Sequence, residues 1–209
     1  MQIAGIVAVW GAVAAASVFG FAGIAHAAPA PNVAHGGGMY GNPAAAAQYW
    51  RRQHDSNCAE MAVADVVGQV TGHEPTEQQI NAAAEATPSV AHRGSIWNPG
   101  GATNNQDLPV LLAHYGVRAV ADQSTTGALE QDLAQGRKVI VGLNSEILWN
   151  QRGNRSQEDH SVVVTGIDTK AGVVHLNDSG SNTGGDEQVR IATFEKSWAT
   201  SQNFAVVTK

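Results

Sequence analysis

The sequence predicts an α+β fold in which N-terminal helices pack on a C-terminal antiparallel β-sheet. Apolar residues recur at helical spacing, three and four residues apart, through much of the stretch 58–136. From residue 138 onward the pattern changes to short runs rich in Val and Ile that are separated by Gly- and Asp-containing turns. Helical segments followed by strand segments are typical of α+β domains.

The first helix is expected to run from Cys58 to about Val70, with Gly72 as its stop. Ser56 or Asn57 is suited to be its N-cap. Cys58, the single cysteine of the chain, therefore falls in the first turn of this helix. Unpaired N–H groups and the positive end of the helix dipole favour an anion there.

A second helix is expected from Thr76, because Thr76 and Gln79 have capping-box spacing, and Pro88 closes it. The long turn-rich stretch that follows is of a length that is more often functional than idle. The remaining predicted elements are the loop 88–106, a short helix led by Asp107, a strand at 117–121, a helix at 128–135, strands at 138–143, 160–168, 173–178 and 188–192, a short helix at 193–200 and a last strand at 204–207.

The N-terminal region differs in composition from the rest of the chain. All 12 Lys and Arg and all 18 Asp and Glu of the 209 residues lie at residue 51 or later. An apolar run ends at the small-x-small sequence Ala25-His26-Ala27, which predicts a signal peptide at 1–27 and thus a secreted or cell-envelope protein. The alternative is an uncleaved membrane anchor. Residues 28–48, rich in Ala, Pro and Gly, are expected to be a flexible spacer, and residues 49–209 one domain with no transmembrane part.

Composition excludes several function classes. The net charge is −6 and no cluster of Lys or Arg is present, which argues against nucleic acid or an anionic membrane surface as a partner. One Cys and scattered His give no zinc-ligand spacing, so we expect no metal and no cofactor. A monomer is expected.

Export bears on the role of Cys58. A secreted chain with one cysteine cannot form an internal disulfide, so the thiol is expected to be reactive or to pair with another chain. The reactive interpretation, a thiolate nucleophile, is favoured. The alternatives are a small buried apolar residue at a helix start and a thiol that links two chains.

A cysteine nucleophile needs an imidazole base and a third group that orients it. Among the eight histidines, His160 and His175 lie on predicted strands, and His54 is a weaker candidate. If 160–167 and 173–180 pair with Ile167 opposite Val173, Asp178 shares a face with His160, whereas His175 lies on the other face. The alternative is that Asp178 only begins the turn Asp-Ser-Gly.

The order of these residues resembles that of papain-like cysteine peptidases, and more closely the family that cuts double-glycine leaders from bacteriocins, with its secreted stand-alone relatives. The matching pieces are QHDSNC, LPVLLAHYG, SEILW, HSVVVTGID and LNDSG. The resemblance implies a papain-like fold over 49–209. It makes Cys58 the nucleophile, His160 the base and Asp178 the orienting acid, and it makes Gln53 the side chain that stabilises the oxyanion with the Cys58 N–H.

The expected function is therefore a secreted cysteine peptidase with a Cys-His-Asp triad and a peptide or protein substrate. In this hypothesis Asp178 keeps Nδ1 of His160 protonated and facing the carboxylate. Trp97 and Trp149 are candidate walls of the substrate cleft, although a role as half-buried anchors is favoured.

Two other functions stay open at this point. One is an amidase or transpeptidase that acts on cell-wall peptides with the same triad. The other is a binding module that has lost activity, which is favoured by the five-residue spacing of Gln53 and Cys58, where the papain-like pattern has six.

Overall fold

The computed structural model describes residues 38–209, so the predicted signal peptide and residues 28–37 of the predicted spacer lie outside the described part. The prediction of a flexible spacer is wrong for residues 39–48. These residues form strand β1 (Met39–Gly41), helix α1 (Pro43–Ala46) and a 3-10 turn from Ala47. Strand β1 pairs with the far end of the strand that begins at His160.

Glycine in this segment suggested flexibility, but Gly41 instead allows two backbone segments to approach each other closely. Gly41 has a φ of 87°, and a Cβ at this position would overlap the carbonyl oxygen of Thr165. The next residue, Asn42, caps α1 by accepting a 3.1 Å hydrogen bond from the N–H of Ala45. The segment is therefore fixed by backbone geometry that composition alone does not reveal.

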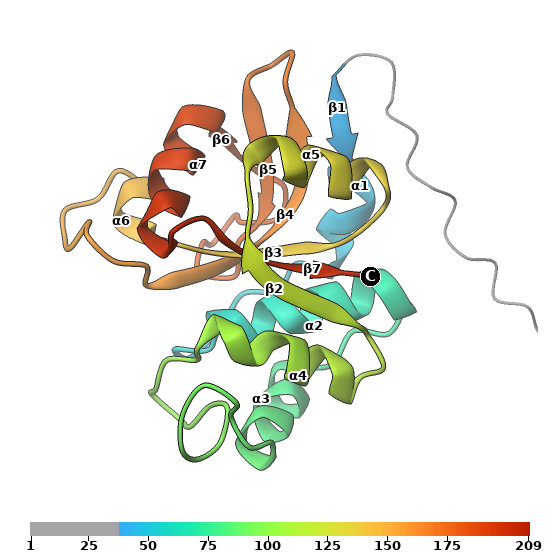
Figure 1. The fold of residues 1–209 in the computed structure, drawn as a ribbon, viewed down its shortest axis with the longest axis vertical. Helices are drawn as coiled ribbons and strands as arrows, with labels where there is room; N and C mark the ends of the chain where they lie inside the picture. The colour runs from blue at the N-terminus through green and yellow to red at the C-terminus, as the bar shows by residue number, and fades with distance from the viewer. Residues whose placement is uncertain (1–37) are drawn as a thin grey trace, which may run out of the picture.

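Three helices form one layer of the molecule. They are α2 (Cys58–Thr71), α3 (Glu77–Ala86) and α4 (Leu108–His114), seen in the lower half of Figure 1. The predicted helix starts and stops are confirmed: α3 has a complete capping box, and α2 ends at Gly72 with a φ of 77°. Asn57 precedes Cys58 as the N-cap residue, but its side chain makes no capping hydrogen bond.

The sheet is antiparallel throughout, with strand order β2-β7-β3-β4-β5-β6 and with β1 added beside β4. This arrangement confirms the α+β fold class. Its strands are β2 (Ala119–Gln123), β3 (Val139–Leu143), β4 (His160–Asp168), β5 (Val173–Asn177), β6 (Glu187–Arg190) and β7 (Phe204–Thr208).

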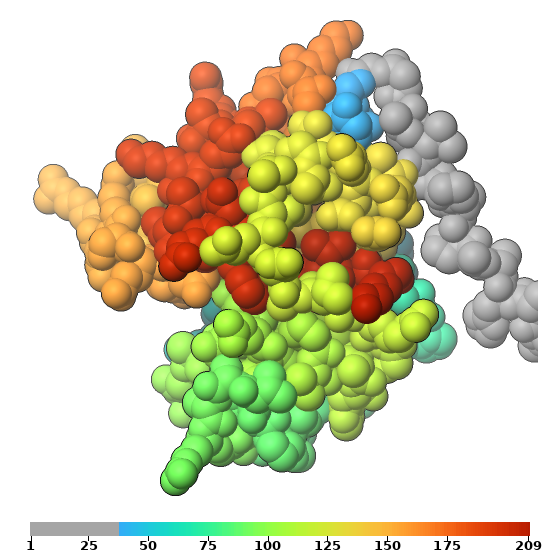
Figure 2. Space-filling view, in the orientation of Figure 1, coloured from blue at the N-terminus to red at the C-terminus, as the bar shows by residue number. Residues whose placement is uncertain are grey.

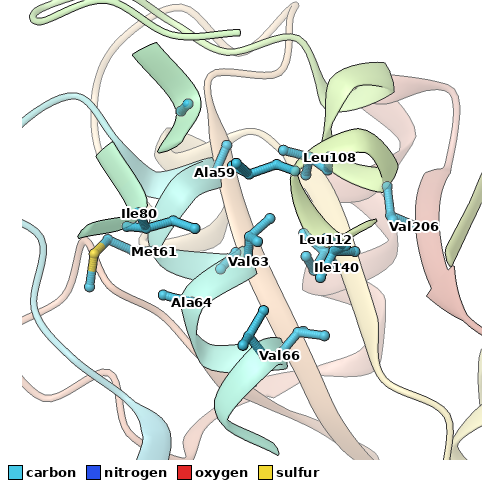
Figure 3. Close-up of a cluster of buried hydrophobic side chains, with 14 of the residues drawn as sticks. Ala59, Met61, Val63, Ala64, Val66, Ile80, Leu108, Leu112, Ile140 and Val206 are labelled. Carbon is cyan, nitrogen blue, oxygen red and sulfur yellow. The ribbon is translucent and has the colours of Figure 1, made fainter. Parts of the chain in front are cut away.

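Two hydrophobic cores lie on opposite faces of this sheet. The first joins α2, α3 and α4 to one face, where Ile140 and Val206 point toward the helices (Figure 3). The second covers the other face with α5 (Thr126–Ala134) and α7 (Ile191–Trp198), beside α6 (Ser145–Leu148). Figure 2 shows the same division on the surface, with residues of α3 and α4 below and residues of α5 and α7 above.

The β4–β5 pairing contains an irregularity that sequence reasoning did not anticipate. Near the turn, Ile167 pairs with Val174 rather than with the predicted Val173. A bulge between Val164 and Gly166 then shifts the register by one residue, so that Val164 faces Leu176. Beyond the bulge the pairing is the one predicted, and it is this end of the hairpin that leads to His160 and Asp178.

Within residues 38–209 we find no helix with both the length and the apolar character needed to cross a bilayer.

Candidate active site

The thiol of Cys58 is half-buried at the start of α2. Because Asn57 does not cap the helix, the N–H groups of the first turn are not engaged by its side chain. Asn57 instead donates 2.8 Å and 3.0 Å hydrogen bonds to Glu77 and Asn81 of α3, which anchors the residue that precedes the thiol. The nucleophile candidate is therefore held by a helix and faces the positive end of its dipole.

The ring of His160 lies between Asp178 and Cys58. Its Nε2 is 2.7 Å from Oδ1 of Asp178, and the ring lies close enough to the Cys58 side chain for the sulfur to raise its pKa. The expectation that Nδ1 faces the carboxylate is wrong, because Nε2 does so. Nδ1 is consequently the nitrogen left for Cys58. The acid is fully buried and His160 is 7% exposed, so both are shielded from water.

The two interpretations of Asp178 are both correct in part. Its Oδ1 also accepts a 2.8 Å hydrogen bond from the N–H of Gly180, as the first residue of a turn does. The same oxygen therefore fixes the turn and orients the imidazole. The other carboxylate oxygen, Oδ2, is buried and has no hydrogen-bond partner in the described part of the chain.

These neighbours set the charge state of His160. Burial lowers its pKa, but the hydrogen bonds and negative charges of Asp178 and Cys58 outweigh burial and raise the pKa to about 10. The ring is therefore an imidazolium at neutral pH. A positive charge beside the sulfur stabilises the thiolate, which is the nucleophilic form of cysteine.

Trp149 covers the histidine. Its ring lies 5.2 Å from that of His160, centroid to centroid, and the two planes are inclined by 52°. Gly180 makes room for both rings, since a Cβ there would come within 3.0 Å of each. Trp97, in contrast, is a buried anchor whose Nε1 donates to the carbonyl oxygens of Ser56 and Gly101. Trp149 is thus part of the site, whereas Trp97 supports the site through its hydrogen bonds to the backbone of Ser56 and Gly101.

Gln53 lies at the cavity that Cys58 lines, and its amide has a defined orientation. Its Oε1 accepts a 2.8 Å hydrogen bond from the Ser179 hydroxyl, and its Nε2 donates one hydrogen to the carbonyl of Asp55. The backbone N–H of Gln53 also donates to the carbonyl oxygen of Ser179. The second Nε2 hydrogen remains available to an oxyanion.

Two cavities lie beside His160, and the first of them is also lined by Cys58. One, of about 660 Å³, lies against Cys58 and is bordered by the loop 100–105. The other, of about 630 Å³, lies against Trp149 and Gly180. Both are lined by Gln53 and His160, so the two cavities adjoin at these residues. Among residues 38–209 there is no group of three or more side chains suited to bind a metal ion.

Comparison with known proteins identifies the chain. A model described as "Peptidase_C39 like family" matches residues 36–206. The chain belongs to the Peptidase_C39 like family. It is 49% identical over 203 residues to Rv1268c of Mycobacterium tuberculosis and to Mb1299c of Mycobacterium bovis, both named as uncharacterized proteins, and the match covers 85% of this chain and 88% of theirs.

Solved structures share the fold of this C39-like protein. A C39-like peptidase from Bacillus anthracis has a TM-score of 0.62 at 15% identity, with 82% of this chain and 97% of that chain covered. A double-glycine-motif protease from an AMS/PCAT transporter, solved with the leader peptide, gives 0.51 at 16% identity, with 76% and 88% covered.

Digestive procathepsin L 3 of Tenebrio molitor gives a TM-score of 0.57 at 13% identity, with 85% of this chain and 72% of that chain covered. The predicted papain-like architecture is thereby confirmed.

The other histidine candidates of this C39-like domain are paired with other carboxylates, although His54 lines the second cavity. His54 is exposed and its Nδ1 lies 2.7 Å from a carboxylate oxygen of Glu77, whereas the Nδ1 of His175 lies 2.6 Å from Asp186. Sequence reasoning missed the contact of Ser179 with Gln53, and for Trp149 it favoured an anchor over a wall of the cleft. The first could have been suspected only from its place directly after Asp178, and the second had no signal that distinguished it from an anchor.

Proposed function

We propose that this C39-like protein is a cysteine peptidase in which Cys58 is the nucleophile, His160 the acid and base, and Asp178 the orienting acid. The observation that carries the proposal is the position of His160. One of its ring nitrogens bonds to a buried carboxylate, and the ring lines one cavity together with the only thiol of the chain and is close enough to it for the sulfur to raise the pKa of the ring. This is the arrangement that nucleophilic catalysis by cysteine requires.

The chemistry follows from this geometry. The Cys58 thiolate attacks the carbonyl carbon of a peptide bond, and the resulting oxyanion accepts hydrogen bonds from the Cys58 N–H and from Nε2 of Gln53. The intermediate collapses as His160 gives its Nδ1 proton to the leaving amine. His160 then takes a proton from water, the hydroxide oxygen attacks the thioester, and the acid product leaves as the thiolate is restored.

An extended peptide is the substrate that suits the cavities. Two hollows of similar volume share His160 and Gln53 in their walls, and Cys58 lines one of them. Such a site can hold residues on both sides of a scissile bond. The related transporter protease that was solved with its leader peptide supports a peptide substrate here as well.

We further propose that the peptidase acts outside the cytoplasm. The support is the apolar run that ends at Ala25-His26-Ala27, followed by a charge-free segment up to Trp50. The protein would then meet peptides of the cell envelope or of the surrounding medium.

Cleavage of a diverse peptide library tests the proposal. The purified protein is expected to cut internal peptide bonds, as mapped by mass spectrometry, and Cys58→Ala is expected to abolish every cut. His160→Ala should reduce the rate by roughly 10²-fold or more. Amide hydrolysis or peptide joining restricted to cell-wall peptides would support the amidase or transpeptidase alternative. Peptide binding without any cut would support the binding module.

A further inference from the structure

We propose that the cavity beside Cys58 binds a cationic side chain, Lys or Arg, of the peptide substrate, and that Glu158 is the carboxylate that receives it. Glu60, which contributes to the same wall, is a second carboxyl that a cation would favour in its ionised form. This inference rests on the proposed peptidase function and names a feature of its substrate.

The wall of this cavity has a strong charge bias. Three of its lining residues are acidic, namely Glu60, Glu158 and Asp159. Within the described chain no Lys or Arg lines it, and its only histidine besides His160 is His92. The charge of the second cavity, beside Trp149 and Gly180, is more balanced. Arg52 and His54 line it together with Asp55 and Asp159. A preference for a cation is therefore expected on one side of the scissile bond only.

The carboxylate of Glu158 is held in place rather than free. Its Oε2 accepts a 3.1 Å hydrogen bond from Nδ2 of the buried Asn105. Asn105 in turn accepts a 2.9 Å hydrogen bond from the hydroxyl of Ser161, the neighbour of His160. A Cβ at Gly142 of β3 would overlap both Asn105 and Glu158, so the absence of a side chain there leaves room for this pair.

Glu60 supplies an independent observation at the same wall. It is fully buried, and although its Oε1 accepts a 2.5 Å hydrogen bond from Thr103, its Oε2 has no hydrogen-bond partner within residues 38–209. A buried carboxylate oxygen without a partner is costly. Since Glu60 contributes to the wall of the cavity, a cation bound there would offset part of that cost.

The pKa values of both carboxyls are those of acids buried without a neighbouring cation. Burial raises the pKa of Glu60 to about 7 and also raises the pKa of Glu158, because hydrogen bonds from Thr103 and Asn105 compensate only in part. An ammonium or guanidinium group in the cavity would favour the ionised form of both. The volume of about 660 Å³ is ample for a long basic side chain.

The test is a positional scan with cleavage and binding read separately. Peptides of ten residues, Ala and Gly with one Lys, Gln or Glu at each position in turn, are offered to the protein. The Lys series is expected to be cut at least about tenfold faster than the Gln series at one position on one side of the scissile bond, and the Glu series more slowly.

Three variants locate the preference. Glu158→Gln keeps the acceptor for Asn105 and is expected to bring the Lys and Gln series to nearly equal rates. Glu158→Lys is expected to reverse the preference in favour of Glu. Glu85→Gln removes one negative charge from the exposed face of α3, outside the cavity, and should leave the preference for Lys unchanged.

The same peptides, now labelled with fluorescein, are also bound to the Cys58→Ala variant. This binding measurement separates the inference from the proposed function. If nothing is cut but the Lys peptide binds more tightly and loses that advantage in Cys58→Ala/Glu158→Gln, the peptidase proposal fails and the cationic subsite stands. If peptides are cut without preference for Lys, or with one that Glu158→Gln leaves intact, the subsite is overturned. Equal binding of the Lys, Gln and Glu series also overturns it.

Discussion

Asp178 shows how much a single residue organises at this site. Its Oδ1 receives hydrogen bonds from His160 and Gly180, its carbonyl oxygen accepts one from Nε1 of Trp50, and its N–H donates to the carbonyl of Gly184. These contacts fix the carboxylate from several directions. A fixed carboxylate holds the imidazole in one orientation, which is what a triad requires of its third member.

The residue after Asp178 links this acid to Gln53, the proposed oxyanion donor. Ser179 meets Gln53 through its hydroxyl and through its carbonyl oxygen. The hydroxyl donates to Oε1 and so determines that Nε2 is the end of the amide free to donate. In this interpretation Ser179 is a positioning residue and touches no substrate.

We expect Ser179→Ala to lower kcat with little change in KM, because the Gln53 amide loses the bond that orients it. The fall should be smaller than the roughly 10²–10³-fold loss expected for Gln53→Ala. Steady-state kinetics on one library-derived peptide measures both. Ser179→Thr, which keeps the hydroxyl, is the matched control.

A double-mutant cycle decides whether Ser179 acts through Gln53. The double variant Gln53→Ala/Ser179→Ala should be no slower than Gln53→Ala alone. Additive losses would contradict the positioning role.

At the residue scale the sequence predicts which residues form the candidate site better than it predicts which of their atoms are in contact. Cys58, His160 and Asp178 follow from helix position, strand parity and resemblance, and the structure brings the three together. The ring nitrogen that faces Asp178 did not follow, because both nitrogens are compatible with the same strand pairing. The anchoring of Gln53 by Ser179 joins residues 126 positions apart, and no local pattern reports such a contact.

Among the elements, the hairpin of β4 and β5 matters most for the site. Near the turn its pairing would place Asp178 on the face opposite His160, because a shift of one residue exchanges the two faces. The bulge at Thr165 restores the register in which Val163 faces Asn177. Thr165, the extra residue of the bulge, also anchors α1, because its carbonyl oxygen accepts a hydrogen bond from the N–H of Asn42.

Deletion of Thr165 is therefore expected to turn Asp178 away from His160 while the rest of the sheet persists. The low-field proton resonance of a histidine bonded to a buried carboxylate should be present in the wild type and absent in the deletion variant. Proton NMR gives this readout, and circular dichroism reports whether the fold is kept.

Deletion of Arg152, which shortens the exposed loop before β4 and touches no pairing, is the control. Persistence of the resonance without Thr165 would refute the role given to the bulge.

Bulges and edge additions are the elements that periodicity predicts least well. The helices over 58–71 and 77–86 were predicted from caps and apolar spacing, which are local signals. Strand β1 was missed because three residues that pair with β4 have no periodicity of their own. The start of β2 was placed two residues early for a related reason, since its limits are set by pairing with β7.

For the molecule as a whole, the helix that bears Cys58 carries two buried carboxyls, Glu60 and Asp65, and is followed by the partly buried Glu74. Burial raises the pKa of Glu60 to about 7, of Asp65 to about 6 and of Glu74, just after α2, to about 7. Asp65 is also bound by Gln69 and by Asn177 of β5, so it joins the helical layer to the sheet. The domain therefore accommodates these groups more easily as neutral acids than as anions.

This predicts that folding stability falls as the pH rises from about 5 to 8. A carboxyl whose pKa is raised in the folded state stabilises the fold below its unfolded pKa, and that contribution is lost as the pH passes the folded value. For Glu60 the loss is on the order of 3 kcal/mol. The raised pKa of His160 acts in the same direction at higher pH. Scanning calorimetry should give a higher Tm at pH 5 than at pH 8.

Glu60→Gln, which keeps an acceptor for Thr103, should reduce the difference in Tm. A Tm that is equal at both pH values, or higher at pH 8, would be incompatible with the buried carboxyls as described.

Alkylation of Cys58 by iodoacetamide, followed by intact-mass spectrometry, tests the central claim most directly, because the chain has no other thiol. The account predicts that at pH 6 the wild type reacts about tenfold or more faster than His160→Ala, since the imidazolium keeps the sulfur as a thiolate. Equal rates in the two proteins across pH 6 to 8 would show that His160 does not activate Cys58 and would contradict the account.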